Sequence, residues 1–399
     1  MHFARRPISY ARLTLRNHTF AAKVALFEIP PAALITHGNA ERHPCGTWHG
    51  GEHRIPFVVP LRIGNESDKH PMSAINVAIL AGGTSGERPI SLQTAAQMAR
   101  WLQGTQYRPW IIDVQYRDWQ YTAPDGECTQ VDKNDFSLPL PQGRIPLHVA
   151  LLATHGTPGE NGLLQGYLEL MQIPYSTGST FAQALSFHKA ACKHYLTGLV
   201  PMAPAIELQR GEPVDAARII AQLGLPLFIK PNDNGSSVGV SKAHTEAELT
   251  QAIEEAFRCS SDLLIEGALT GTEVSCGIVR LGGELTVLPI TEIVPPDEFF
   301  NLQSKYDGSS QEITPARIAP EVAAQVGQYT RLAYQRLQCR GFARADYIVV
   351  GETPYFLEIN TVPGMTAESI LPRQVACAGR SMTEMLCTLL DELITPSGR

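Results

Sequence analysis

The chain has 399 residues, of which 44% are hydrophobic and 18% charged, and its formal net charge is −7. This length favours two or three domains over a single core. The acidic balance argues against a protein that neutralises nucleic-acid phosphates, and no apolar run is long enough to span a membrane as a helix. The eight cysteines include no CxxC pair, which is typical of reduced thiols in a cytoplasmic protein and not of a disulfide framework or a zinc site.

Residues 1–71 differ from the rest of the chain. They hold seven of the twelve histidines and nine Lys or Arg residues against five Asp or Glu residues, and they lack a clear apolar period. Lys23 interrupts the only apolar stretch that a secretory signal could use. Three interpretations stay open: a disordered extension, a small appended element, or a start codon placed too early, which Met72 before a strong strand pattern favours.

Short apolar runs and helical periods alternate from residue 75. Residues 75–80 predict a strand covered on both faces and residues 107–115 another strand, with a helix predicted between them over residues 91–103. A third strand is expected over residues 145–156. This strand–helix–strand order predicts a Rossmann-like parallel α/β domain, to which we assign residues 72–178.

The remaining chain predicts two further segments. Residues 181–199 read as one helix, and strands at 226–230 and 262–269 flank a helix at 245–258, which defines a central segment over 179–270. Strands dominate from residue 271 to 399, with some helix, so the last segment is α+β in character. The strands and helices expected there are 272–281, 283–294, 342–350, 354–364, 321–338 and 381–394.

The loop KPNDNGSSVGVSK, residues 230–242, is rich in glycine and serine. Consecutive backbone N–H groups in such a turn form a concavity that binds anions, and Lys230 can reach the same anion as a point charge. The Walker A pattern is absent, so this predicts a phosphate loop of another kind. A flexible hairpin is the alternative interpretation.

Two strand patterns carry alternating polar side chains. Arg344 and Asp346 are two apart, as are Glu358 and Asn360, so the members of each pair share a strand face. If the strands pair, two carboxylates and an amide oxygen converge, which suits Mg²⁺ already held by nucleotide phosphates. A solvated sheet face with a salt bridge is the alternative.

Three further stretches suggest a site. Residues 81–91 form a glycine-rich turn with Glu87, although the glycine spacing misses the dinucleotide fingerprint for which Asp113 would be the ribose acid. His155 and Glu160 stand at the carboxyl end of the third strand, the edge where open α/β sheets bind ligands. Residues 304–318 predict a flap over a site. The alternatives are a structural histidine and an ordinary surface loop.

Taken in order, these stretches resemble the D-alanine–D-alanine ligases of the ATP-grasp superfamily. The resemblance covers about residues 75–395 and rests on seven motifs: GGTSGERPISL, HGTPGENGLLQG, KPNDNGSSVGVSK, LLIEGALTGTEVS, SKYDGSSQEITPARI, FARADYIVV and LEINTVPGMTAES. It implies an α/β fold in which the N-terminal domain precedes a two-lobed ATP-grasp fold. It also implies a homodimer as the commonest state.

The resemblance implies roles for individual residues. ATP contacts are implied for Lys189, Lys230, Ser236, Ser237, Glu266, Gly267, Leu269, Glu273 and Lys305. Two Mg²⁺ or Mn²⁺ ions are implied on Asp346, Glu358 and Asn360. Substrate and oxyanion contacts are implied for Glu87, linked through Ser236 to Tyr306, and for Arg344, the backbone N–H of Gly364, Ser369 and His155.

The implied reaction joins two D-alanines through a D-alanyl phosphate formed from ATP, for peptidoglycan precursor synthesis in the cytoplasm. Alternatives are a D-alanine–D-lactate or D-alanine–D-serine ligase, another ATP-grasp carboxylate–amine ligase, a nucleotide-binding module without turnover, and a nicotinamide-dependent oxidoreductase. Tyr306 favours the dipeptide product. The chain departs from the usual pattern at His188 and Asn161, where aspartates are common, and at Gly267-Ala268.

Overall fold

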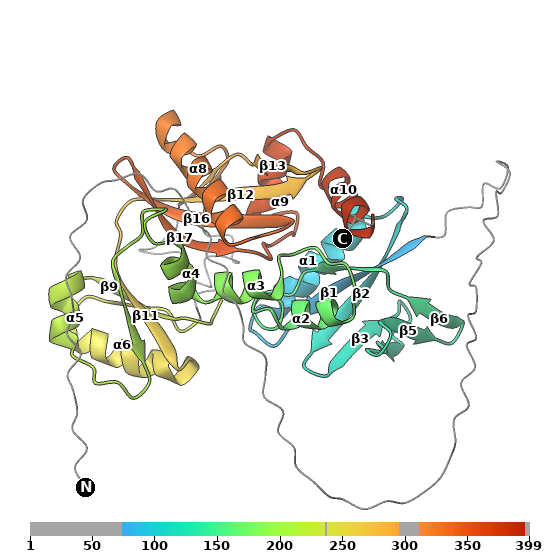
Figure 1. The fold of residues 1–399 in the computed structure, drawn as a ribbon, viewed down its shortest axis with the longest axis horizontal. Helices are drawn as coiled ribbons and strands as arrows, with labels where there is room; N and C mark the ends of the chain where they lie inside the picture. The colour runs from blue at the N-terminus through green and yellow to red at the C-terminus, as the bar shows by residue number, and fades with distance from the viewer. Residues whose placement is uncertain (1–73, 236–237, 295–310, 396–399) are drawn as a thin grey trace, which may run out of the picture. The chain divides into compact units, whose positions relative to one another are not determined.

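The computed structural model describes residues 74–235, 238–294 and 311–395, all within one compact unit, Asp68–Arg399 (Figure 1). The predicted extension at 1–71 lies outside the described residues. So do Ser236 and Ser237 of the glycine-rich loop, and Lys305 and Tyr306 of the predicted flap.

The first sheet has the strand order β4-β3-β2-β1-β7. The pairings of β1 with β2 and with β7 are parallel, whereas β3 and β4 extend the sheet beyond β2 in antiparallel fashion. The predicted parallel strand–helix–strand unit is therefore confirmed. Its elements are β1 (Ile75–Gly82), α1 (Arg88–Trp101), β2 (Tyr107–Gln115), β3 (Asp118–Thr122), β4 (Cys128–Gln130), β7 (Val149–Leu152) and α2 (Leu163–Leu170).

The third predicted strand was too long. Only Val149–Leu152 joins the first sheet, because β6 (Gly143–Pro146) pairs instead with β5 (Ser137–Leu140) in a separate two-stranded hairpin. The four residues of β7 are all buried. His155 consequently lies beyond the end of the strand, at the carboxyl edge of the sheet.

The second sheet has the order β10-β9-β11-β8, with every pairing antiparallel. One face packs on helices α5 and α6 through a core that includes Leu227, Ile229 and Ile253. On β9, Phe228 and Lys230 alternate with those buried residues and therefore point to the other face. The elements are β8 (Ala205–Gln209), α5 (Ala216–Leu223), β9 (Leu227–Pro231), β10 (Ser241–Ala243), α6 (Glu246–Cys259) and β11 (Asp262–Gly267).

The third sheet has the order β15-β14-β12-β16-β17, and β13 pairs with β12 beside that path. The strand predicted at 283–294 is two strands, because Pro289 has no N–H to donate and the chain leaves the ladder there. The elements are β12 (Thr272–Leu281), β13 (Glu284–Val287), β14 (Thr291–Val294), β15 (Gln311–Ile313), α8 (Pro320–Arg336), β16 (Phe342–Val350), β17 (Thr353–Asn360), α9 (Ile370–Cys377) and α10 (Met382–Ile394).

The helix predicted over 181–199 is also two helices, α3 (Thr180–Phe187) and α4 (Lys189–Leu196). His188 between them has an extended backbone (φ −82°, ψ 104°), and its Nδ1 accepts a hydrogen bond from the Ala191 N–H at 3.2 Å. The histidine therefore serves as the N-cap of α4, the position at which short polar acceptors are preferred. The break places Lys189 in the first turn of a new helix.

Helices α4 and α10 each pack in a hydrophobic core whose other residues are distant from the helix in the sequence. Cys192 and Leu196 of α4 pack with residues of β12, β16, β17 and α8. Leu386 and Leu390 of α10 pack in one core with Val77 and other residues of the first sheet. These contacts connect the third sheet with the segments before it.

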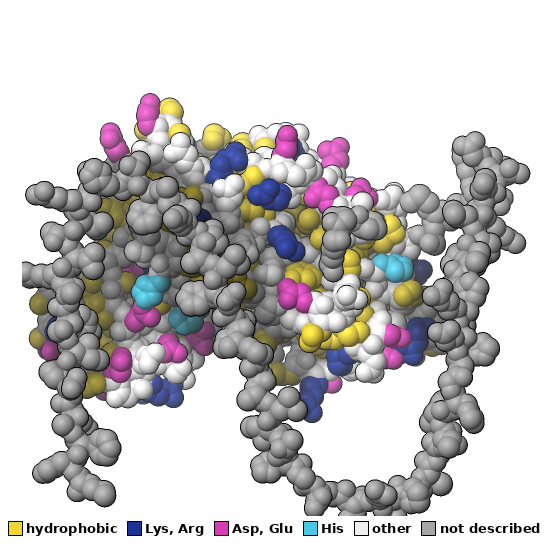
Figure 2. Space-filling view, viewed as in Figure 1, with side chains coloured by type: hydrophobic (Ala, Val, Ile, Leu, Met, Phe, Trp, Pro, Cys, Tyr) yellow, Lys and Arg dark blue, Asp and Glu magenta, His cyan; other side chains and the backbone are white. Residues whose placement is uncertain are grey.

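Within the described part of the chain, none of the helices has the length and apolar character that a membrane crossing requires. On the face seen in Figure 2, side chains of both charge signs are interspersed with hydrophobic and neutral polar ones.

Candidate active site

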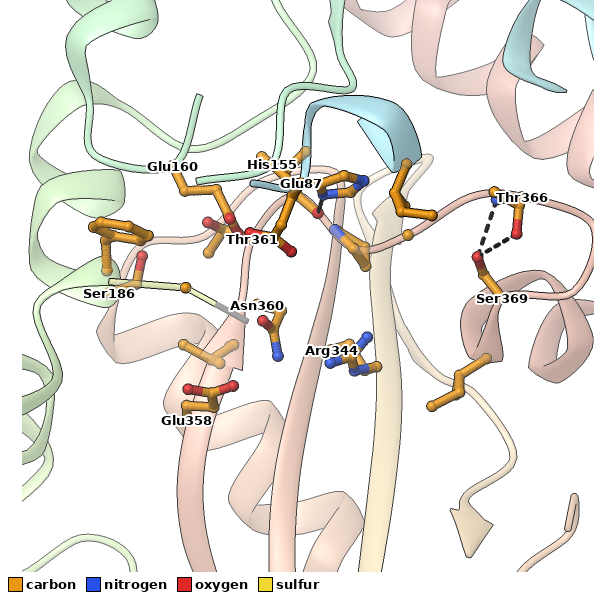
Figure 3. Close-up of a pocket in the computed structure, with 18 of the residues that line it drawn as sticks. Glu87, His155, Glu160, Ser186, Arg344, Glu358, Asn360, Thr361, Thr366 and Ser369 are labelled. Carbon is orange, nitrogen blue, oxygen red and sulfur yellow. Dashed lines mark hydrogen bonds between the residues drawn. The ribbon is translucent and has the colours of Figure 1, made fainter. Parts of the chain in front are cut away.

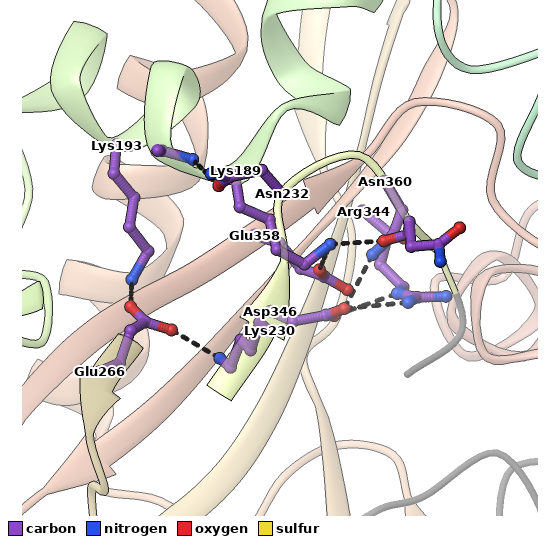
Figure 4. A network of polar contacts seen from close by, with 11 residues as sticks. Lys189, Lys193, Lys230, Asn232, Glu266, Arg344, Asp346, Glu358 and Asn360 are labelled. Carbon is purple, nitrogen blue, oxygen red and sulfur yellow. Dashed lines mark hydrogen bonds and ion pairs between the residues drawn. The ribbon is translucent and has the colours of Figure 1, made fainter. Parts of the chain in front are cut away.

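Strands β16 and β17 bring four polar side chains to one face of the third sheet. Arg344 lies opposite Asn360, and Asp346 lies opposite Glu358. Arg344 donates to both carboxylate oxygens of Asp346, at 3.0 and 2.9 Å, and the Asn360 amide donates to Asp346 Oδ2 at 2.8 Å (Figure 4). The predicted convergence is confirmed, and the salt bridge that the alternative interpretation required is also present.

Asp346 is the buried centre of this group. The Ser275 hydroxyl donates to its Oδ1 at 2.6 Å, in addition to the bonds from Arg344 and Asn360. The side chain of Glu358 is 36% exposed and lies 3.7 Å from Lys189 Nζ. In the described residues no group of three or more His, Cys, Asp or Glu side chains is arranged to hold a metal ion. The oxygens here fit a hard cation that takes further ligands from a bound anion.

The start of the glycine-rich loop is docked on the first turn of α4. Asn232 accepts from the Lys189 N–H at 3.0 Å through its carbonyl and from the Ala190 N–H at 3.0 Å through its side chain. Lys189 Nζ donates to the Asn234 carbonyl at 2.7 Å. The lysine therefore lies between the loop and Glu358, at the positive end of the α4 dipole.

Lys230 and Lys193 share one buried carboxylate, Glu266. Lys230 Nζ lies 2.6 Å from Glu266 Oε2, and Lys193 Nζ contacts Glu266 Oε1 (Figure 4). Burial alone would raise the pKa of Glu266, but the two ammonium groups outweigh it and lower that pKa to about 2. Lys193 was missed in the sequence, although it stands four residues after Lys189 and so shares its helix face.

A cavity of about 710 Å³ is lined by nine of the predicted site residues (Figure 3). In this view Arg344 and Asn360 lie between Glu358 and Ser369, with Glu87, His155 and Glu160 gathered nearby. The predicted residues that line it are Glu87, His155, Glu160, Lys189, Arg344, Glu358, Asn360, Gly364 and Ser369.

His155 and Glu160 are buried in the wall of this cavity. His155 Nδ1 lies 2.9 Å from the Val362 carbonyl and Nε2 lies 3.3 Å from the Thr94 hydroxyl. Burial lowers the pKa of His155, so the ring is neutral at pH 7. The Gly156 N–H donates to Glu160 Oε2 at 2.7 Å, while burial and the nearby Glu87 raise the pKa of Glu160 to about 8.

Ser369 begins helix α9 beside Gly364. Its hydroxyl accepts from the Thr366 N–H at 3.0 Å and lies 2.8 Å from the Thr366 hydroxyl. A Cβ at Gly364 would lie 3.1 Å from Ser369 Oγ. The glycine therefore leaves the serine hydroxyl and the adjacent backbone open to the cavity.

Three further predicted residues, Gly267, Leu269 and Glu273, lie outside the cavity lining. Gly267 follows Glu266 on β11, where its N–H donates to the Pro204 carbonyl at 3.2 Å. Leu269 follows that strand and is partly buried. Glu273 is on β12 opposite Ile348 of β16. Together with Lys230, these residues border the space between the second and third sheets.

The structure argues against the dinucleotide alternative. Asp113 pairs with Arg88 of α1 and also accepts from Gln115 at 3.1 Å. Gly82, with φ +90°, has no room for a side chain, because a Cβ there would meet Asp113 Oδ1. The residue that would have bound a ribose instead ties the start of α1 to β2.

Family models of the two halves of one ligase match this chain. The model described as "D-ala D-ala ligase N-terminus" matches residues 76–179, and the model described as "D-ala D-ala ligase C-terminus" matches residues 199–391. The D-alanine–D-alanine ligase of Porphyromonas gingivalis W83 is 42% identical over 319 residues, which are 79% of this chain and 97% of that protein.

The chain belongs to the D-alanine–D-alanine ligase family. The family suggested by the seven motifs is thus confirmed, and with it the ATP-grasp fold and the assignment as a ligase.

Solved structures of related ligases have the same fold. D-alanyl-alanine synthetase A of Vibrio cholerae superimposes with a TM-score of 0.74 at 27% identity, over 81% of this chain and 99% of that one. The VanG D-Ala:D-Ser ligase of Enterococcus faecalis superimposes with a TM-score of 0.70 at 27% identity, over 79% of this chain and 98% of that one. For the D-alanine–D-alanine ligase of Bacillus anthracis in complex with ATP, the TM-score is 0.65 at 28% identity, over 80% of this chain and 97% of that one.

Proposed function

We propose that this ligase joins two molecules of D-alanine into D-alanyl-D-alanine, using ATP, as a precursor for peptidoglycan. The observation that carries the proposal is the convergence of Glu87, Arg344, Glu358, Gly364 and Ser369 on one cavity. These residues supply the groups that the reaction needs. A carboxylate can hold an ammonium, a guanidinium and an open backbone amide can stabilise a developing oxyanion, and a hydroxyl can bind a carboxylate.

The nucleotide is proposed to lie between the second and third sheets. Lys189 and Lys230 project from different elements toward that space, one bonded to the glycine-rich loop and the other to Glu266. A bound ATP would also give a reason for the carboxylates of Asp346 and Glu358, because Mg²⁺ that accompanies a nucleotide takes only a few ligands from the protein. The relative of Bacillus anthracis was solved with ATP.

The metal would be held by Asp346, Glu358 and Asn360. When bound, it would neutralise charge on the phosphates. For it to bind, Asp346 must give up part of the bonding that it now receives from Arg344 and Asn360. Arg344 would then be left to bind substrate oxygens, while Asn360 would offer its amide oxygen to the metal.

The proposed reaction has two steps. The carboxylate of the first D-alanine attacks the γ-phosphate, giving D-alanyl phosphate and ADP. The amine of the second D-alanine then attacks the acyl carbon, phosphate leaves, and the amine loses a proton. Arg344 and the Gly364 N–H are placed to stabilise the oxyanion of the tetrahedral species.

The two D-alanines are proposed to occupy opposite parts of the cavity. Glu87 would hold the ammonium of the first, and Ser369 would meet the carboxylate of the second, with His155 nearby as a neutral hydrogen-bonding ring. Ser236 and Tyr306, which the resemblance connects with Glu87, stay predictions because they lie outside the described residues.

The location and assembly of the enzyme are also proposals. A cytoplasmic location is supported by the free thiols at all seven described cysteines and by the need for ATP. A homodimer is expected from the family resemblance and can be tested by light scattering of the full chain.

The test is phosphate release with identification of the product by mass. ATP and Mg²⁺ are supplied with D-alanine alone, then with D-alanine plus D-lactate or D-serine. Release with the mass of D-alanyl-D-alanine supports the proposal. Preference for a mixed product would move the assignment to an ester-forming or D-serine ligase. ATP binding without stimulation by any D-amino acid would contradict the substrate assignment.

A further inference from the structure

Lys193, Glu266 and Lys230 form a buried cluster with more positive than negative charge. Two ammonium groups share one carboxylate whose side chain is 3% exposed. The described carboxylates that act on the cluster from farther away are Glu358 and Glu273, both on Lys230. A surplus positive charge held away from water is costly unless an anion can approach it.

The two lysines differ in where they are anchored. Lys193 is on α4, between Cys192 and Leu196, which pack in the core of the third sheet, and its side chain is 8% exposed. Lys230 is on β9, and its side chain is 19% exposed. Glu266 belongs to β11 of the second sheet. The Lys193–Glu266 contact therefore ties a helix that packs on one sheet to a strand of the other, whereas the Lys230–Glu266 contact lies within the second sheet.

We propose that Lys193 is a positioning residue that keeps Glu266 ionised and in place when Lys230 moves to the nucleotide phosphates. Lys230 cannot serve the phosphates and remain the sole partner of a buried carboxylate. With Lys193 present, Glu266 keeps one counter-ion throughout, so nucleotide binding uncovers no unpaired buried charge. The inference rests on the proposed function, because it requires that a nucleotide binds between the two sheets.

Removing Lys193 should make nucleotide binding weaker and dependent on pH. In Lys193→Met, binding would strip Glu266 of its last counter-ion, and protonation of the carboxyl would relieve that cost. We therefore expect the Kd of Mg·ADP to rise roughly ten- to a hundredfold at pH 8. The difference in Kd between Lys193→Met and wild type should shrink as the pH falls toward 6. The Kd of wild type should stay nearly constant over the same range.

The experiment is calorimetric titration of Mg·ADP into the full chain between pH 6 and pH 8.5, with KM for ATP and kcat measured in parallel. Lys193→Arg keeps the positive charge and should restore binding to within about fivefold of wild type. Lys133→Met removes a surface lysine that donates to the Arg117 carbonyl, and it should change nothing. The KM for ATP should rise in Lys193→Met, with kcat changed by less than about threefold.

A double-mutant cycle separates this role from packing alone. In a Glu266→Gln background there is no carboxylate to neutralise, so adding Lys193→Met should change the Kd by less than about threefold. This comparison also applies if Lys193→Met alone fails to fold, which thermal unfolding will show.

Two outcomes would overturn the inference: equal Mg·ADP binding by wild type and Lys193→Met, or the same loss in the presence and absence of the Glu266 carboxylate. Absence of nucleotide binding by wild type would be a different result, because it would contradict the proposed function as well.

Discussion

Asp346 and Glu358 lie directly opposite each other on the paired antiparallel strands β16 and β17. Like charges opposite each other on one sheet face repel. The structure compensates with Arg344 and Asn360 on Asp346 and with Lys189 3.7 Å from Glu358. Glu358 lines the cavity, and Asp346 faces it across the strand pair. Two carboxylates maintained in this way point to a use for both beyond stability, which the first prediction tests.

Replacing Asp346 with Asn should abolish most ligation without unfolding the protein. The amide keeps the shape but loses the charge that would bind the metal and pair with Arg344, so phosphate release should fall by at least about a hundredfold. The matched control is Asp132→Asn, which removes an exposed carboxylate paired with Arg144. Activity of Asp346→Asn near the wild-type value would contradict the metal assignment.

Glu160 should make the protein less stable as the pH rises. Burial and Glu87 raise the pKa of Glu160 to about 8 in the folded state, above its value in the unfolded chain. Between these two pKa values the folded state binds more protons than the unfolded state, so the free energy of unfolding falls with pH by at most about 1.4 kcal/mol per pH unit.

The Glu160→Gln variant removes this dependence and keeps an acceptor for the Gly156 N–H. Its stability relative to wild type should therefore grow as the pH rises from about 5 to about 8. Urea unfolding at several pH values in that window measures the difference. A difference that does not change with pH would show that Glu160 is ionised in the folded protein.

Gly82→Ala should destabilise the first domain more than Gly104→Ala does. Both glycines have positive φ (+90° and +76°), so both alanines incur the left-handed backbone penalty of about 1 kcal/mol. At Gly82 the new Cβ would also displace Asp113 from its pair with Arg88, whereas nothing lies within 4 Å at Gly104.

We expect the free energy of unfolding to fall by about 2–4 kcal/mol for Gly82→Ala. Chemical denaturation of the two variants provides the comparison. Equal losses in both would mean that Asp113 can turn aside at little cost.

His188→Asp should stabilise the protein by about 0.5–1 kcal/mol. His188 now caps α4 through one ring nitrogen, which accepts from the Ala191 N–H at 3.2 Å. An aspartate keeps an acceptor for that N–H and adds a negative charge at the positive end of the helix. His188→Ala removes the acceptor and should lower stability by about 0.5–2 kcal/mol. If both variants unfold at the wild-type temperature, the cap contributes nothing.

The sequence by itself determined the family and the main secondary structure. Residues 77–80 are all buried in the parallel strand β1, whereas buried and more exposed residues alternate along 107–115. Both apolar patterns can be recognised without tertiary information. The alternation at Arg344, Asp346, Glu358 and Asn360 likewise placed the polar residues on shared strand faces before their pairing was known. Motif order then identified the family.

Only the tertiary structure decided where helices and strands are interrupted and which charged side chains pair with each other. The helix break at His188 depends on Asn232, 44 residues away, which bonds the first turn of α4. Lys193 looks like any helical lysine until α4 packs on the third sheet and places it against Glu266 of the second. Such contacts depend on how two sheets approach each other, which local periodicity does not encode because it records only which face of each element is buried.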